Sequence, residues 1–250
     1  MQAYVTLIRR EIGSYFSSMM GFVIIAASMF LLGLSFVVML VKLQQEPTPM
    51  PITELFYMTP FFWLILLLAT PMITMRLFAH EKFTGTFETL MTAPVSDLQV
   101  VLAKFTAGLI FYMLIWLPLI GCLFVVRHYT NDQRPMDLGT LGSTYLGILF
   151  LGCLFVSFGC CASAMTRSQV TAAMIAVLFG ASIFLLGVLA DQLPSRADWQ
   201  AQALAYFGLF EQMHDFSRGV VDTRPLVFLG TLSMFFLFLT LRMVESRRWK

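Results

Sequence analysis

The sequence predicts an all-α protein that crosses a membrane six times. Apolar residues make up 58% of its 250 residues and charged residues only 12%, whereas soluble domains are about half apolar and about a quarter charged. The apolar residues gather in six long runs, and a run of about 20 residues can cross a bilayer as a helix. The six runs cover residues 19–41, 56–77, 100–126, 138–165, 170–190 and 225–241.

The segment before the first run, residues 1–18, predicts an amphipathic helix at the membrane surface. Its apolar residues recur at helical spacing, and Arg9, Arg10 and Glu11 lie on the polar side. The first apolar run is longer than the core of a signal peptide, and no small-residue cleavage site follows it. We therefore expect the run to remain as a span. A simple positively charged anchor is the alternative interpretation of the segment before it.

Between the second and third runs lies a polar segment of 24 residues, 76–99, which is too short for a domain and too patterned for a plain loop. Read as one helix, it places Phe83, Phe87 and Leu90 on a single apolar face. Such an elbow between two spans either meets a partner at the membrane surface or lies passively among the lipid headgroups.

Two capping boxes are expected to start later spans. Pro94 ends the elbow, and Ser96 with Gln99 then has the spacing of a capping box. Thr166 and Gln169 repeat this spacing between the fourth and fifth runs. Only four residues separate those two runs, which predicts a tight helical hairpin.

The longest loop, residues 191–224, lies between the fifth and sixth runs. Its first part is polar, and its second part is apolar enough to form a helix at the membrane interface. A re-entrant segment and an amphipathic cover over the bundle are both compatible with this pattern.

The distribution of basic residues predicts the orientation. Of the 16 Lys and Arg residues, ten lie on the side of the amino terminus and six on the other side. Because cytoplasmic segments carry the excess of positive charge, both termini are expected to be cytoplasmic.

Catalytic, metal and cofactor motifs are not found. The chain has no Walker motif, and its net charge of +2 gives no footprint for nucleic acid. His80 and Glu81 begin like a zinc protease motif, but Thr84 stands where the second histidine is required. The middles of the spans hold almost no ionisable residues, which argues against a proton-coupled carrier.

Several segments resemble the ABC-2 type transporter permeases, which have the type V exporter fold. In the elbow, an acidic residue precedes Gly85-Thr86, and Glu88, Leu90 and Pro94-Val95-Ser96 follow. This order is similar to the cytoplasmic elbow of that family. Three further segments resemble the subgroup typified by the gliding-motility permease: 9–18, 210–224 and 247–249. The chain departs from the subgroup at Met19, where a proline usually follows the serine.

The resemblance implies a single permease domain over residues 1–250, with a surface helix at 1–18, a coupling elbow at 76–99 and an external loop at 191–224. Two such subunits, identical or related, would pair in the bacterial inner membrane with two copies of a separate ATP-binding cassette ATPase. Membrane lipid is the other expected partner. ATP and Mg would be bound by the ATPase, so this chain is expected to be no enzyme and to hold no cofactor.

The resemblance also assigns residues to the contact with the ATPase. The elbow residues assigned to coupling are Glu81, Phe83, Gly85, Thr86, Phe87, Glu88, Leu90 and Pro94, and those of the surface helix are Arg9, Arg10 and Glu11.

Two functions follow from this assignment. One is the permease of an ATP-driven exporter of a lipid-linked, amphipathic or polymeric substrate. The alternative is a non-transporting membrane scaffold in an ATPase-driven assembly or motility machine. A membrane enzyme is a third and more distant reading.

Overall fold

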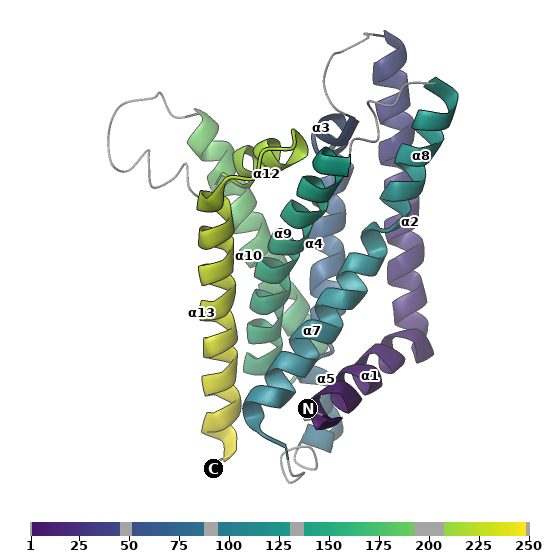
Figure 1. The fold of residues 1–250 in the computed structure, drawn as a ribbon. Coiled ribbons are helices and arrows are strands. Elements are labelled where there is room, and N and C mark those ends of the chain that lie inside the picture. The colour runs from purple at the N-terminus through teal and green to yellow at the C-terminus, as the bar shows by residue number, and fades with distance from the viewer. Residues whose placement is uncertain (1, 46–51, 88–94, 131–137, 193–207, 249–250) are drawn as a thin grey trace.

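Long helices run side by side as a bundle, and shorter helices lie across its ends (Figure 1). The computed structural model describes residues 2–45, 52–87, 95–130, 138–192 and 208–248, and these contain helices but no strand. Within the described residues, six helical stretches are long and apolar enough to cross a membrane, which confirms the predicted fold class. The helices are α1 (Gln2–Ser17), α2 (Met19–Gln45), α3 (Ile52–Tyr57), α4 (Pro60–Thr74), α5 (Ala79–Thr84), α7 (Asp97–Trp116), α8 (Pro118–Thr130), α9 (Leu138–Met165), α10 (Gln169–Gln192), α12 (Leu209–Ser217) and α13 (Thr223–Arg248).

Helix α9 forms the centre of the bundle. It contacts α4, α7, α10, α12 and α13, and its most apolar stretch is 72% buried, against 22% for α13 and 28% for α2. The exposed faces of α2 and α13 carry large apolar side chains such as Phe30 and Phe235. Exposed apolar faces on long helices are suited to lipid.

Prolines set the boundaries of two spans. Pro60 stands at the first position of α4, where its missing N–H costs no helical hydrogen bond, so the second span begins after the separate helix α3. In the third span, Pro118 divides α7 from α8 at Leu117 because a proline cannot donate to the preceding turn.

The two predicted capping boxes have different outcomes. The Ser96 hydroxyl accepts from the Gln99 N–H at 3.3 Å, and the Gln99 side chain accepts from the Ser96 N–H at 3.3 Å, which confirms the first box. The second is wrong: α10 begins at Gln169, and the Thr166 hydroxyl donates to the Ala162 carbonyl instead. The Gln169 amide bonds Nδ1 of His80 at 2.8 Å, so a tertiary contact has replaced the local one.

The ends of the bundle are distinct. Helix α1 lies across the end at which α13 finishes, and α5 lies beside it (Figure 1). Helix α12 lies across the opposite end, packed on α9 and α3. The amino-terminal helix and the carboxyl end of the last span therefore lie at the same end of the bundle, as an even number of spans requires.

Candidate functional site

The elbow begins with a turn that α9 holds in place. Helix α4 ends at Thr74, and a turn leads into α5 at Ala79. The Ser163 hydroxyl of α9 accepts from the backbone N–H groups of Phe78 and Ala79, at 3.1 and 3.0 Å, and donates to the Met75 carbonyl at 3.2 Å. One buried hydroxyl thus satisfies three backbone groups that the broken helix leaves without partners.

Helix α5 ends at Thr84, and Gly85 follows it with a φ of 74°, in the left-handed region that glycine adopts most readily. The prediction of one continuous helix with Phe83 and Phe87 on the same face is therefore wrong, because this residue redirects the chain. Phe83 is 77% exposed, whereas Phe87 is 7% exposed and lies beneath the Lys82 ammonium at 5.4 Å from the ring centroid. Thr86 is exposed beside them.

The predicted coupling residues Glu88, Leu90 and Pro94 lie outside the described residues. The same holds for residues 193–207 of the long loop. The structure thus presents the first half of the elbow, up to Phe87, together with the start of α7.

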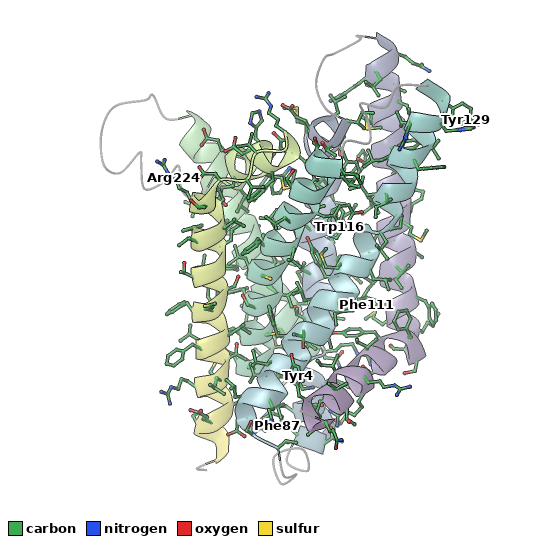
Figure 2. The ribbon with its side chains drawn as sticks, in the orientation of Figure 1. Tyr4, Phe87, Phe111, Trp116, Tyr129 and Arg224 are labelled. Atoms are coloured by element: carbon green, nitrogen blue, oxygen red, sulfur yellow. The ribbon has the colours of Figure 1, made fainter. Side chains whose placement is uncertain are left out.

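Tyrosines hold α1 against the bundle. The buried Tyr15 hydroxyl donates to the Ile73 carbonyl at 3.1 Å, and its ring stacks on Phe111 with centroids 4.6 Å apart. Near the other end of α1, the Tyr4 hydroxyl bonds the Thr106 hydroxyl at 3.1 Å. Figure 2 shows Tyr4 and Phe87 at the same end of the molecule, with Tyr129 at the other. Helix α1 is thus packed against α4 and α7 of the bundle.

A buried ionic cluster joins α1, α5 and α7. The Lys104 ammonium of α7 lies 3.0 Å from Glu11 Oε1 of α1 and 2.8 Å from Glu81 Oε1 of α5. The Arg10 guanidinium closes the cluster from the solvent side, at 2.8 Å from Glu11 and 3.3 Å from Glu81. The Lys104 side chain is only 2% exposed and also faces the Phe78 ring at 5.4 Å.

The cluster is balanced in charge, because two carboxylates face two cations. Burial by itself raises the pKa of Glu11, but the charge of Lys104 and the bonds from Arg10 and Lys104 outweigh it and hold the pKa below its ordinary value. The hydrogen bond to Glu11 raises the pKa of Arg10. In the described part of the chain, Oε2 of Glu81 is buried without a hydrogen-bond partner.

The lowered pKa of Glu11 predicts that acid loosens α1. A carboxyl whose folded-state pKa is depressed adds stability that is complete above its unfolded pKa, near 4.5, and is lost as the pH falls through the folded-state value. We expect proteolysis within α1 to accelerate below about pH 4.5 in the wild type. Glu11→Gln should cleave faster at neutral pH and respond less to acid. An equal acid response in the two proteins would assign the effect to other carboxyls.

A second ion cluster lies at the opposite end, between α3 and α12. The Glu54 carboxylate is fully buried and receives a bidentate contact from Arg218, at 3.0 and 2.8 Å. His214 Nε2 lies 3.3 Å from the same carboxylate, and the Thr53 hydroxyl donates to the Ser217 carbonyl at 2.7 Å. Among the described residues of the long loop, α12 is a cover across the end of the bundle, anchored by these contacts.

The ionic cluster brings together three of the residues predicted for the site, Arg10, Glu11 and Glu81. Arg9 is exposed on α1. Sequence reasoning missed Lys104, which it counted only as one more positive charge. Its place four residues inside the third apolar run was the available clue, because a lysine at such a depth requires a carboxylate partner.

These observations define a class: a polytopic α-helical membrane protein with a surface helix and a polar elbow joined at one end. A family model described as "ABC-2 family transporter protein" matches residues 41–242. The match covers well over half of the chain, so the chain belongs to the ABC-2 transporter family. Members of that family are transmembrane components of ABC transporters and not the ATPase itself, and an ATPase partner is implied in general. A comparison with curated proteins finds no match.

Proposed function

We propose that this chain is the permease subunit of an ABC exporter, and that α1 and the elbow together form the surface on which a separate ATPase subunit docks. Two permease chains, identical or related, would pair with two ATPase copies. ATP and Mg would be bound by the ATPase, and ATP-driven movement of the ATPase would reach the spans through the elbow.

The observation that carries this proposal is the ionic cluster of Lys104, Glu11 and Glu81. It joins the surface helix and the elbow to α7 in one buried network. On the other side of the elbow, Ser163 of α9 accepts a hydrogen bond from the turn that precedes α5. A force applied to α5 would therefore act on α1, α7 and α9 together. Phe83 projects from this unit with most of its surface exposed, as an aromatic anchor for a partner would.

We place the protein in the bacterial cytoplasmic membrane with both termini in the cytoplasm. The support is the excess of basic residues on the side of the amino terminus and the position of α1, α5 and the end of α13 on one side. The motifs at 9–18, 210–224 and 247–249 support assignment to the gliding-motility-like subgroup.

The docking proposal predicts that Phe83→Asp releases the ATPase. A buried aromatic anchor at an interface contributes about 2 kcal/mol or more, so the affinity should fall roughly thirtyfold. The measurement is a mild-detergent pull-down of the chain from its native membrane, with every co-purifying subunit identified. Because Phe83 is exposed, the substitution should leave the fold of the isolated permease intact.

The matched control is Tyr129→Asp, which changes an exposed aromatic residue at the opposite end of the molecule. It should retain the ATPase. Equal retention by Phe83→Asp would refute the docking surface. The same pull-down separates an exporter from a force-transmitting scaffold, because a scaffold would also carry a large partner at the α12 end.

A further inference from the structure

A cavity of about 790 Å³, lined by many polar side chains, lies between α1 and the turn that follows α4. Its wall includes the ionic cluster just described and, in addition, a second set of donors. This second set comprises Ser14, Ser17, Ser18, Arg76, His80 and Thr86. The coupling proposal assigns no role to the cavity, and the inference drawn from it concerns this chain alone.

The cavity carries one positive charge in excess. Glu11 and Glu81 are balanced by Lys104 and Arg10. Arg76 is half-buried, and no carboxylate pairs with it in the part of the chain that the structure describes; its guanidinium donates to the Ser18 hydroxyl. A guanidinium has five N–H donors. A half-buried cation with unused donors can bind an anion through charge-assisted hydrogen bonds, which are stronger than neutral ones.

The hydroxyl beside Arg76 has its hydrogen available as a donor. Ser18 Oγ accepts from Arg76 and from the Met20 N–H at 3.3 Å. Because both of these contacts use the oxygen as an acceptor, the hydroxyl hydrogen remains for a ligand. One charged donor and one neutral donor thus converge, which is the arrangement that holds a phosphate oxygen.

The position of the cavity indicates where the anion comes from. Ser18 immediately precedes α2, so the cavity lies beside the start of the first apolar span. Directly beyond it, Met19 and Phe22 on α2 are 83% and 59% exposed. These exposed apolar side chains, next to the cavity in the sequence, offer a surface suited to the acyl chains of a lipid.

We propose that this cavity binds the headgroup phosphate of an anionic phospholipid, with its acyl chains along α2. The phosphodiester accepts from Arg76 and Ser18 and neutralises the unpaired charge. A lipid of net charge −1 matches the excess of one cation. Seated there, the lipid fills the space between α1 and the elbow and stabilises their relative position.

The test uses the purified, delipidated full chain in detergent, titrated with phosphatidylglycerol and followed by native mass spectrometry and thermal unfolding. We expect saturable binding of one lipid per chain and a rise in melting temperature. Arg76→Gln should bind roughly tenfold more weakly, because it loses charge-assisted hydrogen bonds. The matched control is Arg167→Gln, which removes an exposed positive charge from the α9–α10 turn at the same end.

Further arms separate the sources of the anion. Stabilisation by inorganic phosphate without lipid, or equal binding of phosphatidylcholine, would overturn the assignment to an anionic lipid. Equal binding of phosphatidylglycerol by Arg76→Gln would overturn the site. So would an Arg76→Gln variant that loses the ATPase in the pull-down and still binds the lipid, because an acidic residue of the partner would then be the occupant. The comparison of phosphatidylglycerol with phosphate in the wild type requires no variant. It also requires no ATPase, so its failure is distinct from failure of the coupling proposal.

Discussion

Lys104→Met is expected to destabilise the α1 end of the molecule by about 3–5 kcal/mol, the usual cost of removing one partner from a buried ion pair. The Lys104 ammonium contacts both Glu11 and Glu81 from the buried side, at 3.0 and 2.8 Å. Without it, two carboxylates face each other with only the half-exposed Arg10 between them. We expect a lower melting temperature and faster tryptic cleavage at Arg9 and Arg10, measured on the purified chain.

The expected loss comes from unpaired carboxylates rather than from the missing lysine stem, and this can be tested directly. Combining Lys104→Met with Glu11→Gln and Glu81→Gln removes the three buried charges of this cluster and should restore most of the stability. Lys42→Met, at an exposed lysine on α2, is the control and should melt like the wild type. If Lys104→Met melted like this control, the cluster would contribute little to the attachment of α1.

The spans and the surface helix were predictable because each depends on residues that are close together in the sequence. Apolar runs and helical periodicity define α2, α9 and α10 to within a few residues, and the Ser96–Gln99 box lies within one helical turn. Local rules failed where tertiary contacts competed with them. The Gln169 side chain was predicted to complete a capping box with Thr166, yet it bonds His80, 89 positions earlier in the chain.

The site was predictable only in part, and for the same reason. Arg10, Glu11 and Glu81 drew attention through motifs, but no periodicity connects Glu11 with Lys104, which is 93 positions later. Ser163 is one of many small polar residues in a span, and nothing local marks it as the group that holds the elbow turn. The end of α5 was misread because a helical wheel assumes right-handed backbone throughout, and Gly85 departs from it.

Gly21→Ala is expected to force α1 away from its place on the bundle. A Cβ at position 21 would lie 2.1 Å from the Tyr15 carbonyl oxygen and 2.9 Å from its carbon, which are backbone atoms that cannot rotate aside. The chain turns sharply between α1 and α2 at this point, and the Gly21 N–H bonds the Ser18 carbonyl at 3.1 Å. Relief therefore requires the corner to open, at a cost of about 3 kcal/mol, near the upper range for overpacking.

Opening the corner would move Tyr15 off Phe111 and Glu11 away from Lys104. One added methyl group should therefore disrupt the ionic cluster without changing any charged residue. Gly33→Ala is the matched control, because it lies in the same helix with nothing within 4 Å of its added Cβ and should melt at or above the wild-type temperature. Cleavage in α1 should accelerate in Gly21→Ala and not in Gly33→Ala. If the cleavage rates matched, the corner would not be what positions α1, and the tyrosine and ion contacts alone would hold it beside the elbow.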